Sequence, residues 1–482
     1  MIIGTGVTFN SGFVLTPPAV LPGPPDAPII GTATATSSST ATVSFTAPAY
    51  DGGTTITSYT ATSNPGGITG TLNQAGSGTI TVSGLSILTN YTFTVTATNV
   101  EGTSSPSSES NSIITNGYTL FEFGYNNQGQ LGLGNAGSST ARSSPVQVSS
   151  STGWRSIEGG ANHSIAIKPN NSLWAWGFNS AGPLGLDDTV SRSNPVQVGA
   201  LTNWTKIISG EQFNLAIKSD GTLWAWGANT FGALGTGDAA NRSSPVQIGS
   251  DSNWASIGAG PYVSLAIKTN GTLWVWGRNN NGQLGDNTVV NKSSPIQLGS
   301  DTDWSAASGG GLAASSMTLA LKTSGSMWSW GSNLNGQLGQ NDVVNRSNPV
   351  QIGSLTNWGN ITVSATGGAL AVKTSNTLWS WGVNTNGELG LSLAPGVAGS
   401  NRSSPTQVGT LSNWSTVGTA FTASFSIKTD GTLWSWGRND YGQLGQGEVI
   451  YKSSPVQVGS GSTWTTMPKS TGSLNWGAML TQ

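Results

Sequence analysis

The sequence predicts an all-β protein: a β-sandwich followed by a seven-bladed β-propeller, with a short N-terminal docking arm. Three observations predict this. A motif built around Trp-x-Trp-Gly recurs along most of the chain, and apolar residues alternate with Thr or Ser in the segment before it. Glycine supplies 68 of 482 residues, which is typical of short strands joined by tight turns. A chain of this length is too long for one compact domain.

Charge is scarce and unevenly distributed. The chain has 18 Lys and Arg against 20 Asp and Glu, a net charge of −2, and no cysteine. Residues 1–116 contain no Lys or Arg, so composition divides the chain near residue 117. We therefore expect no nucleic-acid partner, no disulfide and no thiolate-bound metal. No long apolar run and no basic, apolar leader is visible, so we expect neither membrane insertion nor a signal peptide.

The first residues form two short segments. Residues 17–25 contain five prolines, which favour an extended, semi-rigid linker. Residues 1–16 are too apolar for a free tail and too short to fold alone, so we expect an anchoring arm that docks onto another subunit. The apolar side chains expected to anchor it are Ile2, Ile3, Val7, Phe9, Phe13, Val14 and Leu15.

Residues 26–116 read as a β-sandwich. Thr42–Phe45, Ile56–Thr60, Thr79–Val82 and Tyr91–Ala97 alternate apolar with hydroxyl side chains, and Gly-containing turns separate them. Pro25-Asp26-Ala27-Pro28, the AYDGGTTITSY stretch and Gly84-Leu85 before Tyr91 make this segment resemble a fibronectin type III domain. The resemblance implies that Tyr91 forms the tyrosine corner and that Phe45 replaces the usual core Trp. We expect a spacer, with loop-mediated binding as the alternative.

Seven repeat copies of about 50 to 55 residues follow, over residues 117–482. Each combines Trp-x-Trp-Gly, Asn-x-x-Gly-x-Leu-Gly, a basic residue before Ser-x-Pro, and a lone Trp; Phe121-Glu122-Phe123-Gly124 is the first copy. Ser264–Lys268, a turn, and Thr272–Trp276 predict a hairpin that cannot bury both of its faces alone. Radial stacking of such sheets gives a propeller. The array begins and ends with half a copy, so Tyr118–Phe123 and Trp476–Thr481 should complete one shared blade and remove free edges.

These motifs resemble the regulator of chromosome condensation repeat family, and the resemblance implies a seven-bladed propeller. It leaves function open, because one fold can serve unrelated activities. In this family a nucleotide exchange factor for a small GTPase relies on a basic N-terminal tail, and residues 1–116 have no basic residue. A further member implies that the fold can act purely as a binding surface.

Repeated residues have a structural explanation and a functional one. All 20 Trp residues occupy repeat positions, which favours packing between blades over glycan stacking. The basic residues before Ser-x-Pro could order their own loops or form a positive ring that attracts anionic polysaccharide. These residues are Arg142, Arg192, Arg242, Lys292, Arg346, Arg402 and Lys452.

The sequence contains few residues that could form a catalytic site. His163 is the only histidine and is expected to be structural, since no nucleophile elbow accompanies it. The acids are scattered, with Asp187-Asp188 the only adjacent pair, and no phosphate-binding or metal motif is present. We expect no enzyme activity, no cofactor and no metal site.

Residues that break the repeat are the candidate binding residues. After Trp-Gly and near the next turn, most copies have small or polar side chains, whereas a few have aromatic or Arg side chains, which are frequent in recognition loops. The candidates are Phe178, Phe231, Arg278, Arg438 and Tyr441.

Arm, linker, sandwich and propeller together resemble phage fibre or capsid-decoration proteins in layout. We expect a virion-surface structural protein, held by its arm to other virion proteins, which displays the propeller to host-surface polysaccharide or protein and assembles as a homo-oligomer in the particle. The alternative is a secreted or cell-surface bacterial adhesion or inhibitor module.

Overall fold

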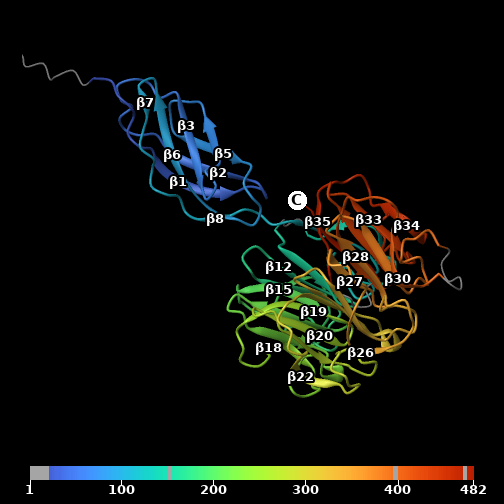
Figure 1. Cartoon of the computed structure of the whole chain (residues 1–482). Coiled ribbons are helices and arrows are strands. Elements are labelled where there is room, and N and C mark those ends of the chain that lie inside the picture. Colours follow the sequence, from blue (N-terminus) through green and yellow to red (C-terminus); the bar gives the residue numbers. More distant parts are fainter. Residues whose placement is uncertain (1–20, 150–152, 394–399, 470–474, 482) are drawn as a thin grey trace, which may run out of the picture. The chain divides into compact units, whose positions relative to one another are not determined.

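The structure, a computed structural model, describes residues 21–149, 153–393, 400–469 and 475–481. The described chain consists of strands and three short 3-10 turns, η1 (Ser138–Thr140), η2 (Thr230–Gly232) and η3 (Ala313–Ser315). It divides into two compact units between Asn116 and Gly117 (Figure 1). The expected all-β architecture, a sandwich followed by a propeller, is confirmed. The anchoring arm falls on residues outside the described ranges.

The first unit is a sandwich of two sheets, ordered β1-β2-β5 and β4-β3-β6-β7, with β8 also pairing β6. Its core combines alternate side chains of both sheets, including Val43, Phe93 and Val95. The rings of Phe45 and Tyr59 lie 4.2 Å apart between the sheets. The strands are β1 (Ile29–Ala35), β2 (Thr40–Thr46), β3 (Ser58–Asn64), β4 (Thr69–Leu72), β5 (Gly78–Ser83), β6 (Asn90–Asn99), β7 (Gly102–Thr103) and β8 (Ile113–Ile114).

Two hydrogen-bonding devices complete this unit. The hydroxyl of Tyr91 accepts a hydrogen bond from the Ser86 backbone N–H at 2.9 Å, which is the expected tyrosine corner. Beyond the short β7, Ser104, Ser107 and Ser110 accept hydrogen bonds from backbone N–H groups of β6 through their hydroxyls. Their own N–H groups donate to β6 carbonyls. These serines cover the edge of β6 where the strand pairing stops.

The second unit contains seven four-stranded antiparallel sheets, the expected number of blades. In each of six blades the lone Trp begins or precedes the first strand, the second strand ends at or just before a lysine, the third carries Trp-x-Trp, and the fourth begins with the basic residue before Ser-x-Pro. Blades 1 to 3 are β11 (Ser156–Gly159), β12 (His163–Ile167), β13 (Leu173–Gly177), β14 (Arg192–Gln197); β15 (Trp204–Ser209), β16 (Phe213–Lys218), β17 (Leu223–Gly227), β18 (Arg242–Gln247); and β19 (Trp254–Ala259), β20 (Val263–Lys268), β21 (Leu273–Gly277), β22 (Lys292–Gln297).

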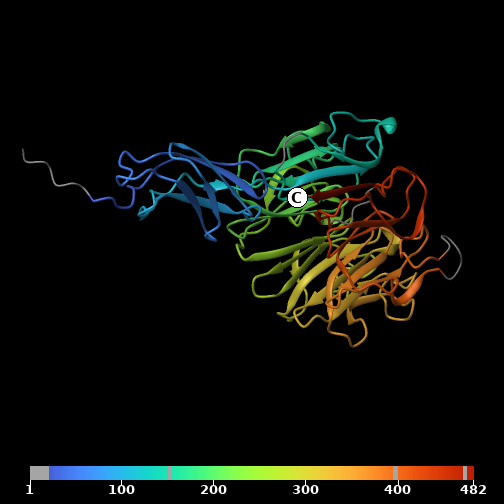
Figure 2. The same ribbon diagram turned by 90° about the horizontal axis from the view of Figure 1, so that it is seen from above.

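Blades 4 to 6 repeat this order, and the first strands of successive blades contact one another around the ring. Figure 2 shows the blades following one another in sequence order around the ring. Their strands are β23 (Trp304–Gly310), β24 (Met317–Lys322), β25 (Met327–Gly331), β26 (Arg346–Gln351); β27 (Trp358–Val363), β28 (Gly368–Lys373), β29 (Leu378–Gly382), β30 (Arg402–Gln407); and β31 (Trp414–Ala420), β32 (Ala423–Lys428), β33 (Leu433–Gly437), β34 (Lys452–Gln457).

The closing blade joins the two ends of the array, as the half-copies predict. β9 (Thr119–Gly124) and β10 (Arg142–Gln147) come from its start, and β35 (Trp464–Thr466) and β36 (Trp476–Thr481) from its end. β36 pairs antiparallel with β9, with Ala478 opposite Glu122. The ring is therefore closed by hydrogen bonds between its first and last strands.

Neighbouring blades are joined by a repeated hydrogen bond. The second Trp of Trp-x-Trp is fully buried and donates its indole N–H to a main-chain carbonyl of the preceding blade. The six pairs are Trp176 to Gln130, Trp226 to Pro183, Trp276 to Ala233, Trp330 to Gln283, Trp381 to Gln337 and Trp436 to Glu388, all at 2.9 to 3.0 Å. At the closing junction Phe123 takes the place of this Trp and packs beside Gly445 and Gly477.

The position of one Trp differs from the expectation. Trp476 lies opposite Gly124, as His163 lies opposite Gly177, so its register position carries no Trp in the other blades and it is not a repeat tryptophan. The basic residues before Ser-x-Pro begin the fourth strands. A fourth strand is an edge strand, and this explains why it tolerates a proline.

Candidate functional site

A pocket of about 440 Å³ opens where loops of blades 2, 3 and 4 meet on one face of the propeller. It contains two of the five candidate residues, Phe231 and Arg278. Its wall is completed by Glu211, Gln212, Phe213, Ala228, Thr230, Ala233, Pro261, Tyr262 and Leu312. A volume of this size suits a small ligand.

Arg278 is placed by a glycine turn. Gly277 ends β21 with φ +101, and a Cβ there would lie 2.4 Å from the carbonyl oxygen of Tyr262. Only glycine fits this approach. The turn lets the Arg278 backbone N–H donate to that same carbonyl at 2.9 Å. The Arg278 side chain is thereby held beside the hairpin turn that carries Tyr262.

Phe231 reaches the same place from the preceding blade. It lies in η2 with φ +63 and is 36% exposed, so its ring is anchored but open to solvent. Its ring stands edge-on to Tyr262, with centroids 5.5 Å apart. The Arg278 guanidinium carbon lies 5.1 Å from the Phe231 centroid and 5.9 Å from that of Tyr262. The guanidinium therefore lies beside two aromatic rings of different blades, within cation–π distance of both.

The charges of the pocket are mixed. Burial raises the pKa of Tyr262, the negative charge of Glu211 raises it further, and Arg278 opposes that change. Tyr262 therefore keeps its hydroxyl proton at neutral pH, and the charges of Glu211 and Arg278 both act on it. The site offers aromatic faces, one cation, one acid and several hydrogen-bonding groups, which suits recognition of a polar ligand.

Arg438 and Tyr441 lie together elsewhere on the ring, in a cluster that satisfies itself. Arg438 forms an ion pair with Asp440 at 2.5 Å, and Asp440 also accepts the Tyr451 hydroxyl. The ring of Tyr441 lies 4.7 Å from that of Tyr125 in the closing blade. Phe178 is half-buried after β13 and does not line the pocket. The five candidates therefore divide among three places.

The sequence prediction missed Tyr262 and Glu211. Both lie in the turns between first and second strands, whereas the candidates came from the segment after Trp-Gly. An alignment of these turns identifies Tyr262 as unusual. It is the residue directly before a second strand, and the same position holds a polar, non-aromatic residue in three other blades: Asn162, Gln212 and Thr422.

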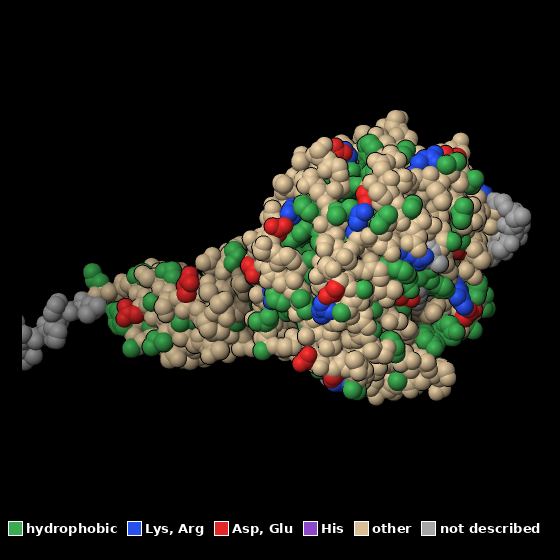
Figure 3. Space-filling model, turned by 90° about the horizontal axis from the view of Figure 1, so that it is seen from below, with side chains coloured by type: hydrophobic (Ala, Val, Ile, Leu, Met, Phe, Trp, Pro, Cys, Tyr) green, Lys and Arg blue, Asp and Glu red, His purple; other side chains and the backbone are tan. Residues whose placement is uncertain are grey.

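The repeated basic residues are engaged within their own blades. Arg192, Arg242 and Arg346 pair with the aspartate four residues earlier, each at 2.6 Å, and Lys452 pairs with Glu448. Lys292 pairs with Asp286 at 3.2 Å, and Arg142 and Arg402 donate to loop carbonyls. Figure 3 shows basic and acidic side chains side by side on the surface. Loop ordering, rather than a free positive ring, describes this geometry.

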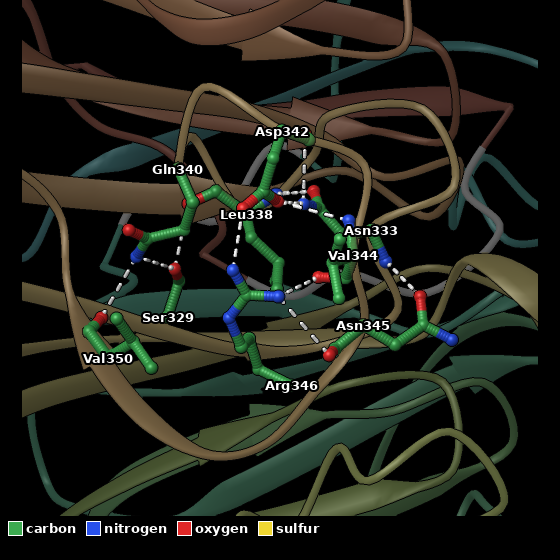
Figure 4. Close-up of polar contacts among 9 residues, drawn as sticks. All are labelled: Ser329, Asn333, Leu338, Gln340, Asp342, Val344, Asn345, Arg346 and Val350. Atoms are coloured by element: carbon green, nitrogen blue, oxygen red, sulfur yellow. Dashed lines mark hydrogen bonds and ion pairs between the residues drawn. The ribbon is translucent and has the colours of Figure 1, made fainter.

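Blade 4 shows how one loop is held (Figure 4). Arg346 donates to Asp342 and to the carbonyl of Val344. Buried Asn333 donates to Asp342 and accepts from the backbone N–H of Leu338. The Asn of the Asn-x-x-Gly-x-Leu-Gly motif therefore holds the two ends of this loop together.

The tryptophans and the strand-end lysines form a second repeated unit. In each of six blades the lysine Nζ lies between the lone Trp and the first Trp of Trp-x-Trp, for example 4.7 Å from the Trp204 ring centroid and 3.3 Å from that of Trp224. Six of the seven lone Trp residues are buried, and Trp464 is half-buried. These rings are committed to packing and cation–π contacts.

Buried titratable groups serve the framework. His163 is buried, its Nε2 lies 2.9 Å from Asn214 Oδ1 in the next blade, and burial lowers its pKa to about 4. Burial raises the pKa of Glu388 to about 7, and its carboxylate accepts from the Asn386 backbone N–H at 2.6 Å. Gln130, Gln283, Gln337 and Gln443 accept the same bond in other blades.

Neither metal ligation nor a membrane helix was found in the part of the chain that the structure describes. No group of three or more His, Cys, Asp or Glu in these ranges could hold a metal ion. No helix in them is long and apolar enough to cross a membrane.

Comparison with known families agrees with this architecture. The profile of the regulator of chromosome condensation (RCC1) repeat matches residues 119–167, 170–217, 220–267, 270–312, 324–372 and 430–467, more than half of the chain. The fibronectin type III profile matches residues 26–113.

Among curated relatives, the RCC1 domain-containing protein RUG3 of Arabidopsis thaliana is 34% identical over 132 residues, which are 27% of this chain and 28% of that protein. The RCC2 homolog of Xenopus laevis is 35% identical over 142 residues, 28% of this chain and 26% of that protein. The matches therefore span about a quarter of those relatives.

Among solved structures, Prp20p of Saccharomyces cerevisiae, described with its binding to Gsp1p and histones, superposes with a TM-score of 0.66 at 19% identity. The match covers 76% of this chain and 92% of that one. Human WBSCR16 gives 0.64 at 16% identity, covering 76% and 99%. At these identities the likeness concerns the fold.

Proposed function

The chain belongs to the regulator of chromosome condensation (RCC1) repeat family, and from this premise we propose that its propeller is a non-catalytic recognition module. One observation carries the proposal: the pocket in which Phe231, Tyr262 and Arg278 converge from two blades. These side chains interrupt a repeat whose Trp residues, strand-end lysines and basic residues before Ser-x-Pro are engaged in the framework. Exposed aromatic and Arg side chains in a concave site are typical binding residues.

We further propose that the module is displayed on the surface of a virus particle. The support is the sequence: a charge-poor, Thr- and Ser-rich chain, an apolar segment at residues 1–16, a proline-rich linker and a fibronectin type III spacer. The apolar segment docks onto other virion proteins, several copies assemble in the particle, and the propeller attaches to a host-surface glycan or protein.

Fractionation of particles tests this placement. Density-gradient-purified particles are analysed for the chain and its copy number by quantitative mass spectrometry. A variant lacking Met1 to Leu15 should fold with unchanged melting of both units and be lost from particles. Particles that carry normal amounts of the truncated chain contradict the arm, and particles without the full chain contradict virion placement.

The secreted or cell-surface bacterial module is the second candidate, because the same pocket serves a recognition module in either setting. Finding the chain in the culture medium or on cells, without particles, favours it. Surface binding by the isolated propeller, measured with and without Phe231→Ala, tests recognition in both cases.

A further inference from the structure

The side chain of Arg278 has a fixed position and no polar partner among the residues that the structure describes. Its Nε is buried without a hydrogen-bond acceptor, and within the described ranges the structure gives its guanidinium no ion pair. The Phe231 and Tyr262 rings lie 5.1 and 5.9 Å from the guanidinium carbon and restrain the side chain. The side chain as a whole is half-buried, so a ligand anion that reaches its unpaired positive charge gains affinity.

Blade 6 contains a natural control for this arrangement. Arg438 occupies the same repeat position as Arg278, and the residue two places later is Asp440. That carboxylate pairs with Arg438 from within the chain. In blade 3 the corresponding residue is Asn280, which is exposed and bears no charge. The same repeat position therefore holds an arginine in blades 3 and 6, but only Arg438 in blade 6 has a carboxylate partner two residues later.

The Asp440 carboxylate that pairs with Arg438 indicates that the group missing beside Arg278 is a carboxylate supplied by a ligand. Arg binds a carboxylate through two parallel hydrogen bonds, which a neutral hydroxyl does not match in strength. The Arg438–Asp440 pair shows that the local backbone accommodates an acid beside this arginine.

The rest of the pocket indicates a sugar ring. Glu211, Gln212, Thr230 and Tyr262 supply both acceptors and donors around the Phe231 ring. A ring with several hydroxyls uses both kinds of group and presents an apolar face to an aromatic side chain. An acidic peptide side chain would use the arginine but would leave the groups suited to hydroxyls unused.

We propose that the Phe231–Tyr262–Arg278 pocket binds an acidic sugar, with the Arg278 guanidinium holding the sugar carboxylate. This inference rests on the proposed recognition function and names its ligand class. It assigns the stacking surface to Phe231 and hydroxyl recognition to Tyr262 and Glu211.

Titration of the full chain with matched sugars is the test. Isothermal titration calorimetry with glucuronic acid, N-acetylneuraminic acid and glucose should show binding of at least one acid and at least about tenfold weaker binding of glucose. Arg278→Gln should weaken the acid to the level of the neutral sugar. Arg438→Gln, at the matched but paired arginine, should leave affinity unchanged.

Asn280→Asp makes the sharpest variant, because it gives Arg278 the internal partner that Arg438 already has. It should abolish binding of the acidic sugar with no loss of thermal stability, since the folded chain contains that pair already. An Asn280→Ala variant controls for loss of the amide and should still bind.

Three results would overturn the inference. Equal affinity for glucuronic acid and glucose would show that the sugar carboxylate does not contribute to binding. If the Asn280→Asp and Arg278→Gln variants bind the acidic sugar as the wild type does, the sugar does not bind in this pocket. Binding of a glutamate-rich peptide with no binding of either acid makes the ligand a protein. The last result leaves the recognition function standing, whereas failure of all probes together with failure of surface binding contradicts both proposals.

Discussion

The indole Nε1 of Trp226 donates a 2.9 Å hydrogen bond to the main-chain carbonyl of Pro183 in the preceding blade. Asn214 Nδ2 donates to the same carbonyl at 2.7 Å. One acceptor on blade 1 thus receives two donors from blade 2, and the Trp side chain is fully buried. The junction combines apolar burial with a polar contact that fixes the register between blades.

Trp226→Ala should therefore lower the free energy of unfolding of the propeller by about 3–5 kcal/mol, because it empties a buried aromatic site. Trp226→Phe keeps most of the ring and removes one donor, for a loss of about 1 kcal/mol from the hydrogen bond plus a smaller packing change. Denaturant titration measures both. Equal losses in the two variants would contradict packing as the larger contribution.

Substitutions in the candidate loops should leave stability almost unchanged. Phe231 and Tyr441 are 36% and 38% exposed, and each contacts one other ring. Phe231→Ala and Tyr441→Ala should each change the free energy of unfolding by less than about 1 kcal/mol. Differential scanning calorimetry beside Trp276→Ala, which should cost about 3–5 kcal/mol, provides the comparison. A large loss in Phe231→Ala would show that this ring belongs to the framework.

Removal of Trp476 to Gln482 should destabilise the whole propeller and not one blade. β36 lies between β9 and β35, so its loss separates the two halves of the closing blade and exposes strand edges. Melting of the truncated chain should shift far below that of the full chain, while the fibronectin type III unit melts as before. Deletion of Gln482 alone is the control. An unchanged propeller transition would contradict closure by β36.

Glu388→Gln should stabilise the propeller at neutral and higher pH. The folded pKa of Glu388 is raised from 4.5 to about 7, so the folded state holds a proton that the unfolded state has released. Stability from this group therefore falls as pH rises from about 4.5 to 7, by up to about 3 kcal/mol. Gln retains the bond made by four other blades, and the difference between variant and wild type should vanish below about pH 4.5. A constant difference from pH 4 to 8 would contradict the raised pKa.

His163→Phe should reduce the acid sensitivity of the propeller. Burial lowers the folded pKa of His163 from 6.5 to about 4, so the unfolded state binds the proton first and stability falls as pH drops from 6.5 to 4. Phe213 occupies the same position in blade 2. Melting temperatures between pH 4 and 7 should fall less steeply in the variant. Parallel profiles would show that His163 does not titrate in this range.

The sequence by itself determined the number of blades and the way the ring closes. Each copy repeats the same alternation and turn residues, so local periodicity and repeat spacing contain that information. The hairpin predicted at Ser264–Lys268 and Thr272–Trp276 corresponds to β20 and β21 within one or two residues. In the sandwich, β1 and β4 went unpredicted: each contains a Gly, and β4 has only one large apolar residue, Leu72.

Only the tertiary structure decided which of the unusual residues act together. Phe231, Tyr262 and Arg278 belong to different turns, and the stacking of blades 2 and 3 brings them to one pocket. Whether an arginine is paired depends on contacts a few ångströms long: Arg438 meets Asp440, and the same position beside Arg278 holds Asn280. Repeat patterns specify a fold through many equivalent local choices, whereas a binding site arises from single side chains that meet only after the blades have packed.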